Sequence, residues 1–241
     1  MQQTTPPFER PMLRMGSVAF LAGLVIFFIS TMLHPSGEDP TNHMLVFTEY
    51  AEDDLWIASH MGQFAGGITI FAGGFVALYR LLVQSESSTA YVLAWIGFAV
   101  AILSASTLAI LQAVDGIALK RAVDFWTVAP PEEKAASFQV AEGIRWIEIS
   151  VNSTFRILQG AVGLIFGVAI LKSTVLSKWI GAVGVFAGVG TIILGVNVAY
   201  VGFATIHSIV DTVSTVAYLG WLVILGIFMW RKSVSKVVTK K

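Results

Sequence analysis

Two histidines and an aspartate have the chemistry and spacing of metal ligands. His207 and Asp211 are four residues apart, so a helix would place both side chains on one face. Together with His60 they form a His/His/carboxylate set, which suits zinc or iron. A hydrogen-bonded His–Asp pair without a metal is one alternative, and axial ligation of a haem by His60 and His207 is another. The cofactor stays open, with a divalent metal favoured over haem.

A stripe of polar residues crosses an otherwise apolar segment. Glu148, Asn152 and Arg156 follow one another at intervals of four residues and therefore share one face of a helix. A lone guanidinium inside a bilayer is costly, so we expect Arg156 to pair with Glu148, Asp115 or Asp211. The stripe then serves either as a buried ion pair that fixes helix register or as a site for an anionic headgroup or carboxylate.

Other polar side chains lie at the same depth in their predicted helices. Residue counting places them all within roughly three turns of one membrane surface. We therefore expect one polar pocket for a small molecule or lipid headgroup, lined by Gln63, Asp115, Glu148, Asn152, Arg156 and Asn197. The remaining histidines, His34 and His43, are expected in a solvated loop.

Composition excludes several classes of function. The 241 residues include no cysteine, so the chain forms no disulfide, thiolate metal site or iron–sulfur cluster. Its net charge is zero and its basic residues are not clustered with aromatic ones, so nucleic acid is not an expected partner. The local motifs of common soluble enzymes are also missing, among them the nucleophile elbow, the phosphate-binding glycine loop and His-Glu-x-x-His. No catalytic residue can be assigned, and whether the protein is an enzyme stays open.

The elements that must position these residues are membrane helices. The chain is 56% hydrophobic and only 12% charged, with a mean hydropathy of +0.77. A bilayer core of about 30 Å needs about 20 apolar residues per helix. Six segments meet this requirement, at 15–33, 55–82, 90–114, 145–171, 178–200 and 206–230. The sequence thus predicts an all-α, polytopic transmembrane bundle of six helices, with residues 1–241 forming one integral membrane domain.

Basic residues predict how the bundle is oriented. Ten lie on the side of the termini (Arg10, Arg14, Arg80, Lys172, Lys178, Arg231, Lys232, Lys236, Lys240 and Lys241) and four on the other (Lys120, Arg121, Lys134 and Arg145). The positive-inside rule then places both termini in the cytoplasm and the connections 34–54 and 115–145 outside, as partly helical loops. Five tryptophans near the predicted interfaces are interpreted as membrane anchors: Trp56, Trp126, Trp146, Trp179 and Trp230. These features indicate a multi-pass protein of the cell membrane.

Short motifs resemble a known family. They are His34-Pro35, the segment Trp56-Ile57-Ala58-Ser59-His60-Met61-Gly62-Gln63, and Leu176-Ser177-Lys178-Trp179-Ile180-Gly181. Together they are similar to an uncharacterised prokaryotic family of membrane proteins, the domain-of-unknown-function family numbered 4386. The resemblance covers most of the chain and implies a six-helix bundle. It implies no activity.

Four functions remain open on these grounds. The leading hypothesis is a membrane protein of unknown activity whose outer half holds the polar pocket. The second is a membrane enzyme that uses His60, His207 and Asp211 as metal ligands and Glu148 as general base. A transporter is the third, although the inner half lacks the polar groups of a conduction path. The fourth is an accessory subunit of a membrane complex or a homo-oligomer, with glycine-rich helix faces as its contacts, although packing inside one bundle explains these faces more simply.

Overall fold

The computed structural model describes residues 9–35, 37–205 and 208–234, and within these ranges the chain is helical with no strands. Six of its helices are long and apolar enough to cross a membrane: Arg10–Met32, Trp56–Leu82, Ser88–Val128, Lys134–Lys172, Lys178–Ala204 and Ile209–Val234. The predicted six-helix membrane bundle is therefore confirmed.

Several of these spans are built from more than one helical element. The first is α1 (Glu9–Met32), and the second joins α3 (Trp56–Thr69), the π-helix η1 (Ile70–Phe75) and α4 (Val76–Leu82). The third joins α5 (Ser88–Ala113), the π-helix η2 (Val114–Leu119) and α6 (Lys120–Val128). The fourth is α7 (Lys134–Lys172), the fifth is α8 (Lys178–Val201) with the 3-10 turn η3 (Gly202–Thr205), and the sixth is α9 (Ile209–Val234). A short helix outside the spans, α2 (His43–Glu52), lies between the first two.

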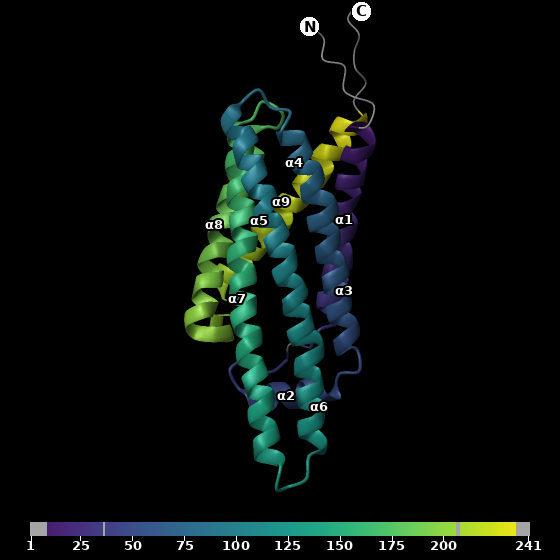
Figure 1. Cartoon of the computed structure of the whole chain (residues 1–241), viewed down its shortest axis with the longest axis vertical. Helices are drawn as coiled ribbons and strands as arrows, with labels where there is room; N and C mark the ends of the chain where they lie inside the picture. The colour runs from purple at the N-terminus through teal and green to yellow at the C-terminus, as the bar shows by residue number, and fades with distance from the viewer. Residues whose placement is uncertain (1–8, 36, 206–207, 235–241) are drawn as a thin grey trace, which may run out of the picture.

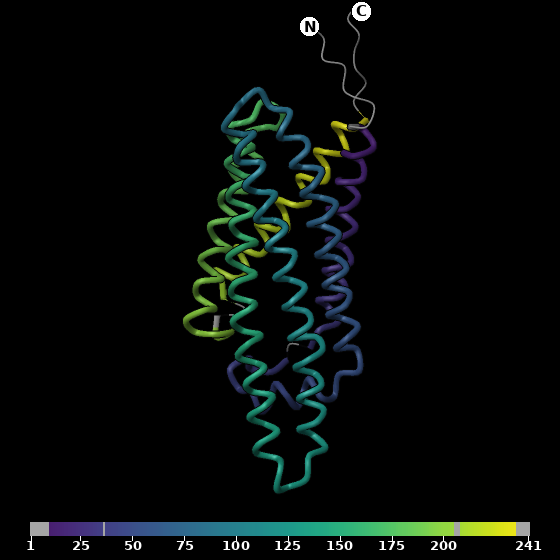
Figure 2. Tube along the Cα trace, viewed as in Figure 1, coloured from purple at the N-terminus to yellow at the C-terminus, as the bar shows by residue number. Residues whose placement is uncertain are grey.

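The two ends of the molecule differ. The start of α1 and the end of α9 lie together at one end, which we call the termini end (Figure 1). At the other end, α2 lies across the bundle and the α6–α7 hairpin extends beyond the other helices; we call this the cap end (Figure 1). The trace shows α9 crossing the bundle obliquely (Figure 2). Cytoplasmic placement of the termini end stays a prediction.

The hairpin is longer than the sequence indicated. The third span runs unbroken for 41 residues and the fourth for 39, so most of the expected connection 115–145 is helix. At about 1.5 Å per residue each helix is about 60 Å long, twice the thickness of a bilayer core. Pro130 and Pro131 interrupt the helices only at the tip, where a proline ring cannot continue the preceding helix. We therefore expect the tip of this hairpin to project beyond the bilayer core.

Glycines allow close helix packing within the bundle. A Cβ atom on Gly160 of α7 would lie 2.6 Å from the carbonyl oxygen of Gly188 in α8. Likewise, a Cβ on Gly66 of α3 would lie 2.6 Å from the carbonyl oxygen of Gly23 in α1. Only glycine fits such contacts, which is the usual role of small residues in membrane helices. These glycine faces are thus occupied inside the bundle.

A second hydrophobic core holds α2 against the hairpin. Phe47 of α2 is fully buried, and its ring lies 6.2 Å from that of Trp126 and 5.5 Å from that of Phe138. Lys120 of α6 reaches the end of α2, where its Nζ donates to the carbonyl oxygens of Tyr50 at 2.9 Å and Ala51 at 3.0 Å. A cation at the C-terminus of a helix satisfies its free carbonyls. The cap is therefore a packed structure that covers the end of the bundle.

The tryptophans divide into two groups. Trp146, Trp179 and Trp230 are about half exposed, as anchors in a bilayer interface would be. Trp56 is completely buried and Trp126 is 7% exposed, so the interpretation of these two as membrane anchors is wrong. Both belong to the second hydrophobic core, where they pack with residues of α2. The position of a tryptophan near the end of a span does not show whether its ring faces lipid or a packed core.

Candidate functional site

His60 lies in the first turns of α3 and is completely buried. Its Nδ1 lies 2.7 Å from the carbonyl oxygen of Trp56. A carbonyl only accepts, so Nδ1 carries the hydrogen and, in the neutral ring, Nε2 carries the lone pair. That Nε2 lies 3.0 Å from Oδ2 of Asp115, without the geometry of a hydrogen bond. The second nitrogen of His60 thus faces a carboxylate.

The π-helix η2 brings Asp115 to this position. A π-helical turn widens the backbone and shifts the register of the residues that follow, and such turns are frequent at functional sites. The carbonyl of Asp115 accepts a hydrogen bond from Nε1 of Trp56 at 3.1 Å. The side chain of Asp115 is 13% exposed, and its Oδ1 is buried with no hydrogen-bond partner.

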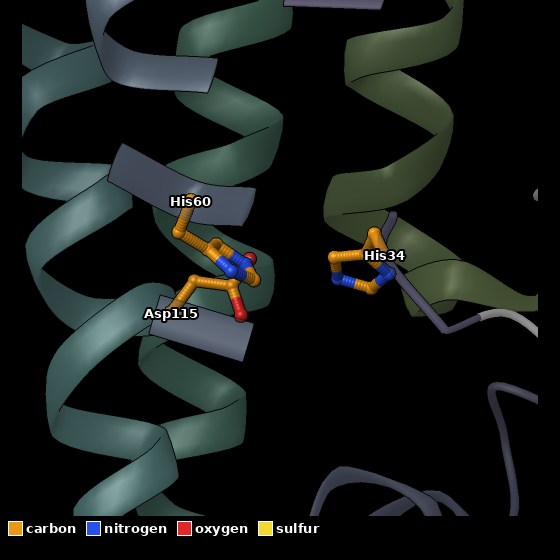
Figure 3. Close-up of side chains that lie close together, drawn as sticks. All are labelled: His34, His60 and Asp115. Atoms are coloured by element: carbon orange, nitrogen blue, oxygen red, sulfur yellow. The ribbon is translucent and has the colours of Figure 1, made fainter. Parts of the chain in front are cut away.

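His34 follows α1 and completes a cluster with His60 and Asp115. The rings of His34 and His60 are 5.0 Å apart between centroids, and one nitrogen of His34 is turned towards the His60–Asp115 pair (Figure 3). Its Nδ1 donates to the carbonyl oxygen of Pro35 at 2.6 Å. Burial lowers the pKa of His34 below its usual 6.5, which favours the neutral ring. The expectation of a solvated His34 is wrong, because the packing of α1 carries its end beneath the cap.

The cluster has the dimensions of a metal site. One ring nitrogen of His34, one of His60 and a carboxylate oxygen of Asp115 all lie within 4.8 Å of one another. Nε2 of His60 and Oδ1 of Asp115 are also buried atoms without hydrogen-bond partners. Buried polar atoms are normally satisfied, so the orphaned atoms require an explanation.

A second buried group adjoins this cluster. Nη1 of Arg145 lies 2.9 Å and 2.7 Å from the two carboxylate oxygens of Glu148, and it also donates to the hydroxyl of Tyr50 at 3.1 Å. The side chains of Arg145 and Glu148 are only 3% and 4% exposed. The sequence places Arg145 at the outer end of the fourth predicted span, and the structure shows α7 continuing past it to Lys134, so its side chain is buried. Tyr50 links this pair to the cluster, because its hydroxyl contacts Arg145 and its ring lies beside those of Trp56 and His34.

The ring of Tyr50 joins α2 to the histidines. It lies 3.9 Å from the ring of Trp56 and 6.1 Å from that of His34, between centroids. Burial raises the pKa of the Tyr50 hydroxyl well above its usual range, so the phenol stays protonated. The other cap histidine, His43, lies outside the cluster with its Nδ1 3.0 Å from Oε1 of Glu142, and its side chain is 11% exposed rather than solvated.

Arg156 lies in a third polar group. Its Nε donates to Oδ1 of Asn152 at 2.8 Å, and its Nη1 lies 3.3 Å from Oδ1 of Asp211 in α9. The side chains of Arg156 and Asp211 are 22% and 15% exposed. The predicted ion pair between Arg156 and a carboxylate is confirmed, with Asp211 as the partner.

The expected pocket residues therefore fall into separate places. Asp115 and Glu148 lie towards the cap end with His60, whereas Arg156 lies with Asn152 and Asp211. By residue counting, Asn152 is about 6 Å and Arg156 about 12 Å from Glu148 along α7. Gln63 accepts a hydrogen bond at 3.3 Å from Nε2 of Gln112, one turn below His60, and Asn197 is half-buried near the cap end of α8. Of the predicted metal ligands, His207 lies outside the described residues, and Asp211 lies against Arg156 rather than beside His60.

Fold and site together define a class: a six-span helical membrane protein with a buried polar centre under a helical cap. The chain belongs to the family described as domain of unknown function DUF4386, whose model matches residues 15–229. No curated protein and no solved structure matches the chain. The family brings no activity, so the chemistry of the centre must be argued from its own residues.

Proposed function

We propose that this membrane protein binds a divalent transition-metal ion at its cap end, with His34, His60 and Asp115 as ligands. The observation that carries the proposal is that three potential ligand atoms lie within 4.8 Å of one another. A cation between them would satisfy Nε2 of His60, a buried atom that has no hydrogen-bond partner.

The hydrogen bonds around the histidines support this proposal. Each Nδ1 donates to a main-chain carbonyl, of Pro35 for His34 and of Trp56 for His60. Metal-binding histidines commonly hold their second nitrogen in this way, which fixes the tautomer and the orientation of the ring. Two imidazoles and a carboxylate suit zinc, iron(II) or a similar ion, and three protein ligands leave a coordination position open. The binding of a small molecule or lipid headgroup by the Arg156 group stays a prediction.

Metal analysis of the purified protein tests the proposal. The protein is prepared without a polyhistidine tag, loaded with Zn²⁺ and dialysed, and its zinc content is measured by mass spectrometry. We expect one zinc ion per chain in the wild type and strongly reduced content in His34→Gln and Asp115→Asn. The matched control is His43→Gln, which removes a histidine of the same cap that pairs with Glu142, and it should retain the metal. A metal-free wild type would defeat the proposal, as would equal zinc in all four proteins.

A further inference from the structure

The charges around the proposed metal do not balance. Counted with both carboxylates ionised, as they would be beside a divalent cation, Asp115 and Glu148 contribute two negative charges and Arg145 one positive charge, while the two histidines bind metal as neutral rings. These groups sum to one negative charge, so a divalent ion leaves one positive charge. A buried charge without a counter-charge is strongly unfavourable. The occupied centre therefore has a place for one anion.

Arg145 offers a hydrogen bond that such an anion can accept. Nη1 of this side chain already contacts Glu148 and Tyr50, but its Nε is buried and has no partner. The guanidinium carbon lies 5.5 Å from the ring centre of Tyr50 and 4.7 Å from that of Phe203, so aromatic rings enclose it. The hydroxyl that Arg145 contacts belongs to Tyr50, whose ring lies 6.1 Å from that of His34, so the guanidinium lies one side chain away from the centre.

We infer that the metal-bound centre takes a singly charged oxygen anion, a carboxylate or a phosphodiester, with one oxygen on the metal and another accepting from Nε of Arg145. This inference rests on the proposed metal site. It satisfies the orphaned donor of Arg145 and completes the charge balance, and the three-ligand set leaves the metal position that the anion needs.

A groove of about 430 Å³ lies along the cap ends of α7 and α8, and Ile149 and Gly202 are among its lining residues. Arg145 and the three proposed ligands do not line this groove, so an anion would reach Arg145 only past Phe203. Ile149 is one helical turn from Arg145, and Gly202 directly precedes Phe203, whose ring covers the guanidinium. The anion has two candidate sources, a soluble carboxylate or phosphodiester and the headgroup of an anionic lipid.

Cobalt substitution gives the test a spectroscopic readout. The full-length protein in a neutral detergent is loaded with Co²⁺, and its visible spectrum is followed during titration with acetate and with dimethyl phosphate. A parallel titration uses phosphatidylglycerol in the same detergent. We expect the spectrum to shift and the shift to saturate. A shift at far lower concentration of phosphatidylglycerol than of the small anions identifies the lipid headgroup as the source. A shift at far lower concentration of the small anions identifies a soluble anion as the source.

A charge-neutral double variant isolates Arg145. Arg145→Met with Glu148→Gln removes one positive and one negative charge, so the net charge stays the same and no buried carboxylate loses its partner. We expect it to bind Co²⁺ as the wild type does, but to bind the anion about tenfold more weakly or worse, because the charge-assisted hydrogen bond is gone. The matched control replaces the other ion pair, with Arg156→Met and Asp211→Asn, and should keep the anion affinity of the wild type.

Different failures have different meanings. If the spectrum of the Co²⁺ protein does not change with any of the anions, the metal binds only hydroxide or water. This result overturns the anion site and leaves the proposed metal site unaffected. Equal anion affinity in the wild type and the Arg145 double variant also overturns it. A wild type that binds no Co²⁺ overturns both proposals.

Discussion

Gly116 and His60 are in direct contact across two helices. A Cβ atom placed on Gly116 would lie 2.5 Å from the Cβ of His60, closer than real side chains approach. Gly116 directly follows Asp115 in the π-helix η2, so one glycine sets how near the carboxylate and the imidazole can come. The site therefore depends on a residue that contributes no ligand atom.

Gly116→Ala should weaken metal binding without removing a ligand. The added methyl group forces α3 and η2 apart, and overpacking of this kind costs about 1–3 kcal/mol. We expect about tenfold lower zinc affinity or worse in a chelator competition assay. Gly143→Ala is the control, because no atom lies within 4 Å of a Cβ at that position. Equal affinities in the two variants would contradict the contact.

Metal removal should lower the thermal stability of the protein. A ligand that binds only the folded state at 100 times its dissociation constant adds about 2.7 kcal/mol. The melting temperature of the wild type in detergent should therefore fall with a chelator and recover with added zinc. His34→Gln should lose most of this response, since it lacks one ligand. A wild type that melts at the same temperature with and without chelator would count against the site.

The Arg156–Asp211 pair should contribute to stability. Arg156→Leu leaves the carboxylate of Asp211 without its guanidinium partner in a mostly buried position. Because both side chains are partly exposed, the loss should stay below the about 3–5 kcal/mol of a fully buried pair. The double variant Arg156→Met with Asp211→Asn should melt at a higher temperature than Arg156→Leu. The reverse order would show that the pair is not the source of the effect.

Lys120 should control how firmly α2 is held. Lys120→Met removes the donor of two hydrogen bonds to the C-terminal carbonyls of α2. Amide exchange within His43–Glu52 should then speed up, while exchange in α8 should not change. Lys134→Met serves as the comparison, since Lys134 donates to the carbonyl of Thr127 at the exposed hairpin tip. If both variants speed exchange in α2 equally, Lys120 is not its anchor.

Cysteine labelling tests the orientation of the molecule. The chain has no cysteine, so a single introduced thiol is the only one present. Glu132→Cys at the hairpin tip should react with a membrane-impermeant reagent on intact cells, whereas Glu86→Cys at the termini end should react only after lysis. The opposite pattern would invert the topology.

Features that depend on local composition could be predicted from the sequence. The six spans follow from hydropathy, since every backbone polar group in lipid must be satisfied within a helix. The partner of Arg156 could be narrowed to three carboxylates, because a lone guanidinium there is costly. Asp211 proved to be the partner.

The rest of the site depends on contacts between distant segments. His34 follows a predicted span, and only the packing of α1 against α3 brings its ring close to His60 and Asp115. Arg145 lies at the outer end of a predicted span, and only the continuation of α7 to Lys134 buries its side chain. The π-helix at Val114–Leu119 leaves no periodicity that a sequence pattern can reveal. The sequence placed His60 and Asp115 at one depth, and the structure brings them together, whereas His34 was expected in a solvated loop.

The unequal lengths of the spans link the site to the thickness of the bilayer. The helices α1 and α8 have 24 residues each, whereas the α5–α6 span continues for 41. A mismatch between the hydrophobic length of a helix and the thickness of the bilayer is accommodated by a change in tilt or by a local change in the bilayer, so helices of different length respond differently. His34 is attached to the short α1 and Asp115 to the long hairpin, so such a change would move one ligand past the other. If the proposed metal is bound, its affinity should accordingly vary with the acyl-chain length of the host lipid.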